Sequence, residues 1–315
     1  MLDTPSSPDS PVSKADVNHN AERRKLWLAA IKPPMYSVAI MPIWIGSALA
    51  RAEQGKGDGR IFAIFLLAAI CILAWTNISN DVFDAQTGID RNKRHSIVNL
   101  TGKPQLMFWL GNSFLLLGIL GILWIAGQQK DGTVLLLILG CCALGYVYQG
   151  PPFRWGYQGW GEVLCFFPFG PLGVTAAYYS QTQMVSWTGL ATSVVVGVTT
   201  SLILFCSHFH QVEDDQAAGK RSPVVRLGTA RAARLTPWIC GFTYLWTLGL
   251  IGFGILPLGA IAAILVSLLP AITLSQLLLQ HHAEPEKIAH SKFIAIRFHF
   301  AYNLCLGLAV SLSSL

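Results

Sequence analysis

Charged residues are scarce in this chain of 315 residues. Only 12% of them are Asp, Glu, Lys or Arg, whereas soluble domains carry about 25%. With so little charge the chain cannot cover itself with a water-facing polar surface, which argues against a soluble globular protein. The sequence also has no Gly/Ser-rich linker and no second polar block that would separate two domains.

Paired cysteine motifs and an N-terminal apolar leader are missing as well. The seven cysteines are scattered, with no C-x-x-C pair, and Cys141 and Cys142 are neighbours, too close for an ordinary disulfide. This excludes a disulfide framework and a cysteine-ligated zinc site. Residues 1–22 are polar and rich in Pro and Ser, unlike a cleavable signal peptide. We expect them to form a disordered cytosolic tail before a single transmembrane domain at 23–315.

Apolar residues are abundant: they make up 53% of the chain, and the mean hydropathy is +0.50. They fall into long blocks, and about 20 mostly apolar residues suffice for a helix to cross a bilayer. The sequence predicts an all-α, multi-pass membrane protein whose nine transmembrane helices form a bundle around a central cavity, in contact with lipid. We place the spans at residues 26–50, 61–79, 106–127, 133–149, 161–180, 189–208, 235–255, 257–280 and 293–314.

Basic residues gather on one side of these spans. All but four of the 22 Lys and Arg residues lie in the N-terminal segment, at adjoining span ends or in the connections 80–105, 150–160, 209–234 and 281–292; the exceptions are Arg51, Lys56, Arg60 and Lys130. The positive-inside rule puts that side in the cytosol or its topological equivalent. Because much of the net charge of +6 stands beside acidic clusters, it suggests a bound anion, and we expect no nucleic-acid partner.

The first acidic cluster ends the second predicted span. On a helix, Asn77, Asp81 and Asp84 stand at positions i, i+4 and i+7 of one face, Asn80 lies next to that face, and Asp90 follows after a turn. Carboxylates this close repel one another and are disfavoured near lipid. A divalent cation such as Mg²⁺ resolves both problems, because it prefers carboxylate and amide oxygens. A solvated acidic helix end, the plainer interpretation, does not explain the shared face.

A second acidic run follows the sixth span and leads directly into basic residues. His208, Gln211 and Asp215 share a helical face at i, i+3 and i+7. Acidic ligands followed by cations suit a metal-bridged diphosphate, because metal ions and cations take different phosphate oxygens. An ordinary mixed-charge loop is the alternative, and His208 and His210 can also be core or interface histidines. The basic residues are Lys220, Arg221 and Arg226.

Aromatic residues surround the connection between the fourth and fifth spans, from Tyr146 and Tyr148 through Phe153 to Trp160. Near a diphosphate, aromatic faces can stabilise a developing carbocation, and they can stack a flat acceptor. An interfacial aromatic belt explains the pattern equally well. The aromatic residues therefore leave the choice open.

Together these motifs resemble the UbiA-type intramembrane aromatic prenyltransferases, from about residue 22 to residue 310. The family's first motif is similar to Asn80-Asp81-x-x-Asp84, and its second is similar to the acidic run before Gly219-Lys220. Further stretches resemble the 1,4-dihydroxy-2-naphthoate prenyltransferase branch and its cyanobacterial and plastid subgroup, whose product leads to phylloquinone. These stretches are Trp27 to Lys32-Pro33, His95 to Gly102, Tyr148-x-Gly150-Pro151, His210 to Asp215 and Ala218 to Gly228.

The resemblance implies a magnesium-dependent transfer of a prenyl group, phytyl in this subgroup, from its diphosphate to 1,4-dihydroxy-2-naphthoate with loss of CO₂. It also implies that both acidic clusters bind metal while cations hold the diphosphate. The implied catalytic residues are Asp81, Asp84 and Asp215; the implied metal ligands are Asn77, Asn80, Asp81, Asp84, Asp90, Gln211, Asp214 and Asp215; the implied substrate contacts are Lys32, Arg91, Lys93, Tyr148, Lys220, Arg221 and Arg226.

Three positions depart from the family pattern. Relatives that make menaquinone tend to have aspartate where Gln211 and Glu213 stand, and arginine is common where Lys32 stands. The second metal ion is therefore expected to have fewer carboxylate ligands, with Asp215 as the main one and Asp214 or Glu213 as auxiliaries.

Two kinds of alternative stay open. The acceptor could be that of a menaquinone-type enzyme, or homogentisate, 4-hydroxybenzoate or chlorophyllide. A cation transporter also places acidic residues in the membrane, but transporters carry ionisable groups near the midplane, whereas these carboxylates stand at span ends. Soluble prenyl synthases share the acidic motifs but not nine spans, and they are excluded.

Overall fold

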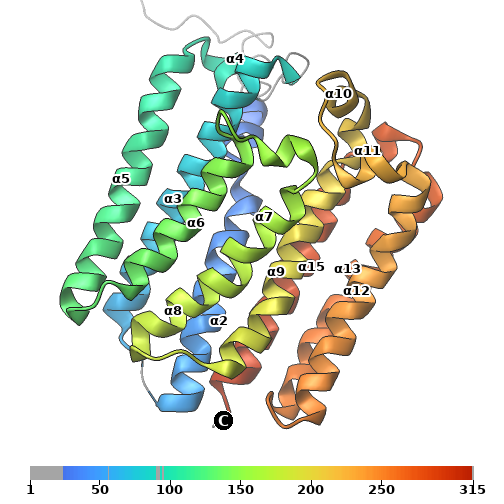
Figure 1. The fold of residues 1–315 in the computed structure, drawn as a ribbon. Coiled ribbons are helices and arrows are strands. Elements are labelled where there is room, and N and C mark those ends of the chain that lie inside the picture. Colours follow the sequence, from blue (N-terminus) through green and yellow to red (C-terminus); the bar gives the residue numbers. More distant parts are fainter. Residues whose placement is uncertain (1–23, 56, 90–92, 94–95, 314–315) are drawn as a thin grey trace, which may run out of the picture.

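The structure is a computed structural model that describes residues 24–55, 57–89, 93 and 96–313. In these ranges the chain consists of helices and their connections, without a strand, as the all-α prediction requires (Figure 1). The predicted tail at 1–22 lies outside the described residues, so the domain division stays a prediction.

A helical stretch at 24–31 precedes the first complete element. The elements that follow are η1 (Pro33–Tyr36), α2 (Ser37–Gln54), α3 (Gly59–Thr87), α4 (Ile97–Thr101), α5 (Pro104–Gln129), α6 (Thr133–Gln149), η3 (Trp155–Gln158), α7 (Gly161–Phe167), the π-helical turn η4 (Pro168–Leu172), α8 (Gly173–Thr182), α9 (Trp187–Ser207), η5 (Phe209–Gln211), α10 (Val212–Ala217), α11 (Pro223–Leu227), α12 (Thr229–Gly252), η6 (Leu258–Ala260), α13 (Ile261–His281), α14 (Pro285–Ile288) and α15 (Ser291–Ser311).

Seven helical segments of the described chain are long and apolar enough to cross a membrane. They are Arg24–Gln54, Gly59–Thr87, Pro104–Gln129, Gly161–Thr182, Trp187–Ala217, Leu258–His281 and Pro285–Ser311. The other two predicted spans correspond to α6, a shorter apolar helix, and α12, which packs against α9 and α13. The chain is therefore a multi-pass membrane protein, while the count of nine crossings stays a prediction.

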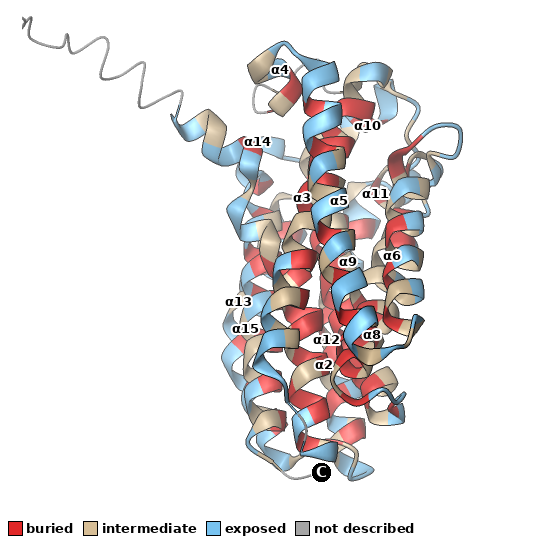
Figure 2. Ribbon diagram, turned by 90° about the vertical axis from the view of Figure 1, so that its left-hand side faces the viewer, coloured by how far each residue is buried: buried red, intermediate tan, exposed pale blue. Residues whose placement is uncertain are grey.

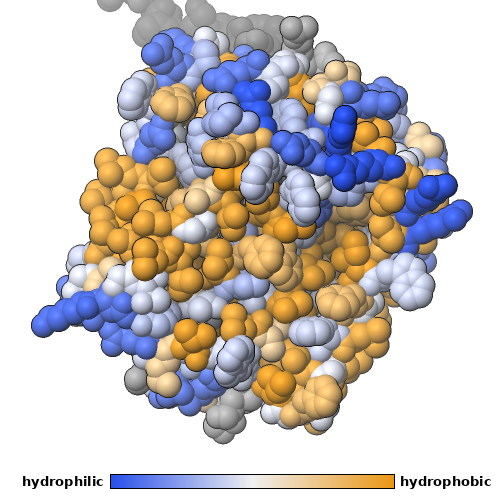
Figure 3. All heavy atoms as spheres, viewed as in Figure 1, coloured by the Kyte–Doolittle hydropathy of each residue, from blue (hydrophilic) through white to orange (hydrophobic). Residues whose placement is uncertain are grey.

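The outer surface of the bundle suits lipid. Figure 3 shows a broad apolar region on the face that it presents. Leu136, Trp238 and Leu269 are 70%, 77% and 74% exposed on helices of the bundle. Such side chains would be unfavourable in water, so this surface is best satisfied by hydrocarbon.

Helix α9 lies at the centre of the packing, against α2, α7, α8, α12 and α15. Buried residues line its length and the inner faces of its neighbours (Figure 2). The approach of α2 to α8 depends on Gly46, because a Cβ there would lie 2.6 Å from both the Ala177 Cβ and the Val174 carbonyl oxygen. Close helix packing thus fixes the frame that carries the polar segments.

The polar segments lie together at one end of the bundle, with α4, α10 and α11, whereas the C-terminus lies at the other end (Figure 1). We call the first the site end. The opposite end carries the C-terminal end of α2, the N-terminal end of α3 and the connections at 130–132 and 183–186 (Figure 1). Helix α3 continues past its apolar part to Thr87 and ends at Gly88, whose φ of 77° closes the helix. Asp81 and Asp84 are therefore held on a helix, as predicted.

Two local details differ from the predicted spans. The first span is interrupted at Lys32, which adopts a left-handed conformation with φ 54°. Pro33 follows it and disfavours a helical conformation at the residue before it. At the tight connection between α12 and α13, Pro257 caps η6 in an extended conformation and does not occupy the first helical position.

Candidate functional site

A polar pocket of about 120 Å³ opens at the site end. Its walls come from α3, the connection after it, α6, η3, the end of α9, η5, α10 and the connection after α10. The lining residues are Asn80, Asp84, Ile89, Lys93, Tyr148, Tyr157, Leu204, Ser207, His208, Gln211, Asp214, Asp215 and Lys220. Side chains from the two acidic clusters, more than a hundred residues apart in sequence, thus meet in one pocket.

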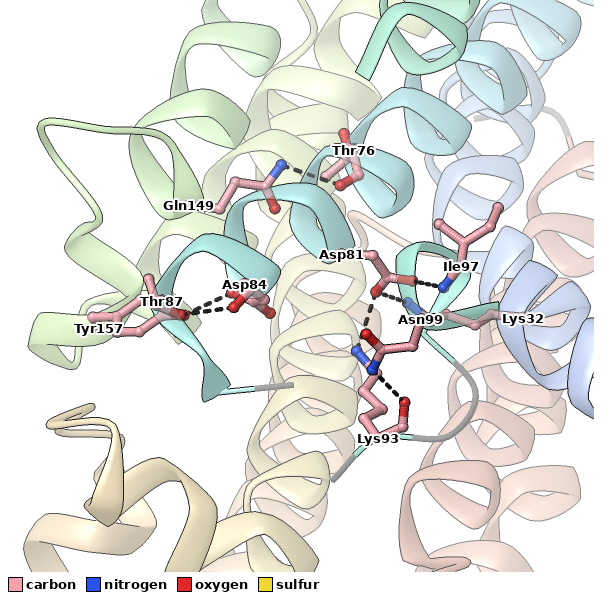
Figure 4. Close-up of polar contacts among 10 residues, drawn as sticks. All are labelled: Lys32, Thr76, Asp81, Asp84, Thr87, Lys93, Ile97, Asn99, Gln149 and Tyr157. Atoms are coloured by element: carbon pink, nitrogen blue, oxygen red, sulfur yellow. Dashed lines mark hydrogen bonds and ion pairs between the residues drawn. The ribbon is translucent and has the colours of Figure 1, made fainter. Parts of the chain in front are cut away.

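Asp84 brings the first cluster into this pocket. Its Oδ1 accepts a 2.7 Å hydrogen bond from the Tyr157 hydroxyl, which also lies 2.9 Å from the Thr87 Oγ1 (Figure 4). Burial, together with the Asp84 carboxylate, raises the pKa of Tyr157. The phenol therefore stays protonated and keeps donating to Asp84 at neutral pH.

Asp81 is turned toward different partners. Its side chain is 1% exposed; Oδ1 lies 3.2 Å from the Lys32 Nζ and 3.1 Å from the Lys93 Nζ, and Oδ2 accepts a 2.9 Å bond from the Ile97 backbone N–H (Figure 4). A buried carboxylate needs such compensation. Asp81 reaches the pocket only indirectly, through Lys93, which lines it.

Asp215 is the buried carboxylate of the second cluster. It is 1% exposed; its Oδ2 lies 2.9 Å from the His208 Nδ1, and its Oδ1 lies 3.2 Å from the Lys220 Nζ. The predicted common helical face of His208, Gln211 and Asp215 is wrong: positions i and i+7 of an α-helix are about 10.5 Å apart along its axis, and His208 reaches Asp215 because the 3₁₀ turn η5 interrupts the helix between them. The second cluster therefore also pairs a carboxylate with a lysine beside the pocket.

The connection at 150–160 ties the two clusters together. The Tyr157 carbonyl accepts a 2.7 Å bond from the Arg221 backbone N–H, the Lys220 Nζ lies 5.8 Å from the Tyr157 ring centre, and the Arg226 guanidinium donates to the Gln158 carbonyl. Gly159 permits this approach. It has φ +90°, and a Cβ there would lie 2.4 Å from the Arg221 carbonyl oxygen.

The predicted site residues divide into three groups. Eight line the pocket: Asn80, Asp84, Lys93, Tyr148, Gln211, Asp214, Asp215 and Lys220. Five lie close to it in the fold without lining it: Lys32, Asn77, Asp81, Arg221 and Arg226. Asp90 and Arg91 lie outside the described residues. Asp81 and Asp84 are three residues apart on one helix, but only Asp84 lines the pocket.

Sequence reasoning gave no role to two residues at the site. Tyr157 lies in the aromatic connection, but α4, α5 and α6 separate it in sequence from the acidic end of α3, so no local pattern signals its bond to Asp84. Glu162 lies in the first turn of α7. Its Oε1 is 3.6 Å from the His208 Nε2. A carboxylate in the first turn of an apolar span is itself a signal of function.

The pocket offers a donor set that suits a hard divalent cation. Three carboxylates (Asp84, Asp214, Asp215) and two side-chain amides (Asn80, Gln211) line it, and magnesium prefers such oxygens. Within the described residues, no three His, Cys, Asp or Glu side chains already converge at metal-binding distance. The ammonium groups of Lys93 and Lys220 also line the pocket, where they lie 3.1 Å from the Asp81 Oδ1 and 3.2 Å from the Asp215 Oδ1.

Comparisons with known proteins identify a family and relatives of the chain. The model of the UbiA prenyltransferase family matches residues 39–303. The chain is 52% identical over 280 residues to a 2-carboxy-1,4-naphthoquinone phytyltransferase of Synechocystis sp., covering 88% of this chain and 90% of that one. It is 42% identical to the chloroplastic 2-carboxy-1,4-naphthoquinone phytyltransferase of Arabidopsis thaliana, over 91% of this chain and 77% of the relative.

A solved structure shares the fold. It is a UbiA homologue from Archaeoglobus fulgidus bound to GPP and Mg²⁺, with a TM-score of 0.55. The alignment covers 89% of this chain and 99% of the homologue, at 15% sequence identity. At that identity the likeness concerns the arrangement of helices.

Proposed function

Because the chain belongs to the UbiA prenyltransferase family, we propose that it transfers a phytyl group from phytyl diphosphate to 1,4-dihydroxy-2-naphthoate, with loss of CO₂, in phylloquinone biosynthesis. This acceptor is the reduced form of the 2-carboxy-1,4-naphthoquinone for which the two curated relatives are named. The hydroquinone is the reactive form in this proposal, because only an electron-rich ring attacks an allylic cation.

One observation carries the proposal. Oxygen donors from two segments that are distant in sequence, together with two lysines, line the same pocket at the site end of the bundle. A diphosphate needs both metal ions and cations, because its oxygens carry several negative charges. Lys93 and Lys220 would release Asp81 and Asp215 and bind diphosphate oxygens, while Lys32, Arg91, Arg221 and Arg226 contribute positive potential around them.

The proposed metal is Mg²⁺, which a solved relative of the same fold holds beside GPP. Its proposed ligands come from the first cluster, with Asn77, Asn80, Asp81, Asp84 and Asp90, and from the second, with Gln211, Asp214 and Asp215. When bound, magnesium supplies the positive charge that stabilises the departing diphosphate.

The protein's own groups then act on the two substrates. The allylic C–O bond breaks as the cations hold the leaving diphosphate, and the Tyr148 ring, which lines the pocket, can face the resulting cation. The naphthoate carbon that bears the carboxylate attacks this cation, and CO₂ leaves. The surrounding apolar helices and lipid exclude water, which would otherwise quench the cation.

The proposed orientation places the site end in the cytosol, in a plasma or thylakoid membrane. The distribution of basic residues supports it, since all but four of the 22 lie on the N-terminal side of the spans. Labelling of single introduced cysteines from either side of sealed vesicles tests the orientation.

Product analysis tests the function itself. Purified enzyme with Mg²⁺ and 1,4-dihydroxy-2-naphthoate is offered phytyl, geranylgeranyl or solanesyl diphosphate, and product masses are read out. We expect a decarboxylated phytyl naphthoquinol as the preferred product. No product from this acceptor, but prenylation of homogentisate or 4-hydroxybenzoate under the same conditions, would overturn the proposal.

A further inference from the structure

A second hollow lies behind the polar pocket. It is an apolar groove of about 400 Å³ between α7, α9 and α12, walled by Phe166, Phe167, Val198, Phe205 and Ile239. Its volume is within the range of small-molecule sites, roughly 300–1,000 Å³. The polar residues among those lining it are Glu162 and Ser201, and the Ser201 hydroxyl already donates to the Glu162 backbone carbonyl.

Glu162 stands where the groove and the polar pocket meet. Within the part of the chain that the structure describes, both of its carboxylate oxygens are buried without a hydrogen-bond partner, and its Oε1 lies 3.6 Å from the His208 Nε2. His208 lines the polar pocket and contacts Asp215 through Nδ1. At 3.6 Å the His208 Nε2 lies beyond hydrogen-bond distance of the Glu162 carboxylate. The carboxylate can therefore accept a hydrogen bond from a bound molecule.

From this geometry we infer that the groove binds the aromatic acceptor and that Glu162 is the catalytic residue that takes the proton of its ring hydroxyl. This inference rests on the proposed function. A hydroxynaphthoate matches the groove, because its fused rings are apolar and its hydroxyl donates to the unpaired oxygens of Glu162. A prenyl or acyl chain has no donor, so a chain in the groove would leave these oxygens buried and unpaired.

The same placement orients the reacting carbon. In the acceptor, the carbon that bears the carboxylate is bonded to the carbon that bears the 1-hydroxyl. A hydroxyl held at Glu162 therefore puts that carbon at the boundary with the polar pocket, where His208, Asp215 and Lys220 stand. The two substrates then enter from different sides and meet at this boundary.

The proposed reaction needs no further proton donor or acceptor, because Glu162 takes up a proton and later returns it. The prenyl C–O bond breaks and its electron pair leaves with the diphosphate. The carboxylate-bearing carbon forms the new C–C bond while the ring hydroxyl gives its proton to Glu162 and becomes a carbonyl. The product of that step is a β-keto carboxylate, which loses CO₂. The electron pair of the broken bond returns to the ring oxygen, which takes the proton back from Glu162.

The first test is Glu162→Gln, which keeps a hydrogen-bond acceptor but removes the base. We expect kcat to fall roughly 100-fold, within the range for acid–base catalysis, with the KM values of both substrates within about threefold of wild type. Glu162→Asp should recover part of the loss. Glu286→Gln, an exposed glutamate at the same end, is the matched control. Turnover of Glu162→Gln within about threefold of wild type overturns the assignment.

A binding measurement separates this role from a merely structural one. Glu162→Met removes the hydrogen-bond acceptor. We expect it to weaken binding of 1-hydroxy-2-naphthoate roughly tenfold and to leave 2-naphthoate, which lacks the hydroxyl, unchanged. Equal effects on both probes contradict a bond between the hydroxyl and Glu162. If the wild type makes no product from the acceptor, the proposed function fails; if it does and Glu162→Gln matches it, only this inference fails.

The occupant of the groove is tested by filling it. Val198→Trp, or Val198→Met if the larger residue prevents assembly, should raise the KM for the acceptor roughly tenfold or more and leave the KM for phytyl diphosphate unchanged. The reverse pattern assigns the groove to the prenyl chain, and no change in either KM assigns it to neither substrate. Both of these outcomes overturn the inference.

Discussion

Carboxylates stand at both ends of this helix bundle, but their partners differ in kind. At the opposite end, Asp58 caps α3 by accepting from the Arg60 and Ile61 backbone N–H groups, and Asp131 accepts from the Thr133 backbone and the Tyr179 hydroxyl. These donors are neutral and fixed in place by helix geometry. Such carboxylates close helix ends.

At the site end the two fully buried aspartates are paired with cations, whereas Asp84 accepts from the Tyr157 hydroxyl. Asp81 is paired with Lys32 and Lys93, and Asp215 is paired with Lys220. A lysine ammonium is a compact charge on a flexible stem, so it can move from a carboxylate to a phosphate when another cation replaces it. Neutral donors thus hold the carboxylates that cap helix ends, whereas lysines hold Asp81 and Asp215 beside the pocket in which we propose that a charged substrate binds.

The largest effect should come from removing a carboxylate at the site end. We expect Asp84→Ala or Asp81→Ala to abolish magnesium-dependent turnover, by roughly a thousandfold or more, while the protein still inserts in the membrane. Product formation per purified enzyme and the size-exclusion profile are measured together. Asp131→Ala at the opposite end is the control and should keep turnover. Full activity in either site variant would refute the metal assignment.

Removal of a cation should have a smaller effect and act on the diphosphate. Lys220→Ala takes away the partner of Asp215, and we expect the KM for phytyl diphosphate to rise roughly tenfold, because one charge-assisted contact to a phosphate oxygen is lost. The acceptor's KM should stay within about twofold. Arg51→Ala removes an exposed charge at the opposite end and should change neither constant. An unchanged diphosphate KM in Lys220→Ala would contradict the exchange of partners.

Two tyrosines give a matched pair, since each donates to an aspartate. Tyr157→Phe removes the bond to Asp84, and we expect kcat/KM to fall roughly three- to tenfold, about the effect of one hydrogen bond. The alkaline limb of the pH profile should not move, because the raised pKa of Tyr157 keeps the phenol protonated there. Tyr179→Phe should leave kcat/KM unchanged. Equal activity losses in both variants would remove the distinction between the two ends.

Tyr179→Phe should instead lower thermal stability in a pH-dependent way. Hydrogen bonds from Tyr179 and Thr133 lower the pKa of Asp131. The stabilisation they give is therefore present above the unfolded carboxyl pKa of about 3.9 and is lost as the pH falls through the lower folded-state pKa. The Tm difference from wild type should be visible at neutral pH and disappear in strong acid. A difference that grows in acid would contradict this sign.

The smallest effect is expected from Gln211→Asp. Gln211 already lines the pocket. Relatives that make menaquinone tend to have aspartate at this position, so the variant carries their residue. We expect turnover within roughly threefold of wild type. Complete inactivation at normal expression would count against the alignment of the second motif.

The arrangement of long helices could be predicted from the sequence, because apolar blocks and basic connections are recognised over many residues and do not depend on single contacts. The sequence also indicated that both acidic clusters lie at one end. It could not predict that Asp81 and Asp84, both on α3, have different partners. That difference depends on where Lys93, Ile97 and the connection at 150–160 lie against the helix, and helical periodicity does not contain this information. The break at Lys32 was predictable in principle from the two prolines that follow it.

The sequence shows a glutamate at the start of α7, but it does not show which residues contact that glutamate. Only the fold places Glu162 against His208, which stands 46 residues further along the chain, and only the fold shows that its carboxylate oxygens lack donors. Residues whose role depends on a contact between distant segments are those that pattern reasoning misses.

The central claim is that residues of both acidic segments bind one metal-bound diphosphate. Its most direct test is the anomalous density of Mn²⁺, used in place of Mg²⁺, in crystals of the enzyme with an unreactive phytyl thiodiphosphate. The account predicts metal peaks beside Asp84 and beside Asp215, on either side of a single diphosphate, with Lys93 and Lys220 turned onto its oxygens. Metal and diphosphate bound away from either segment would contradict it.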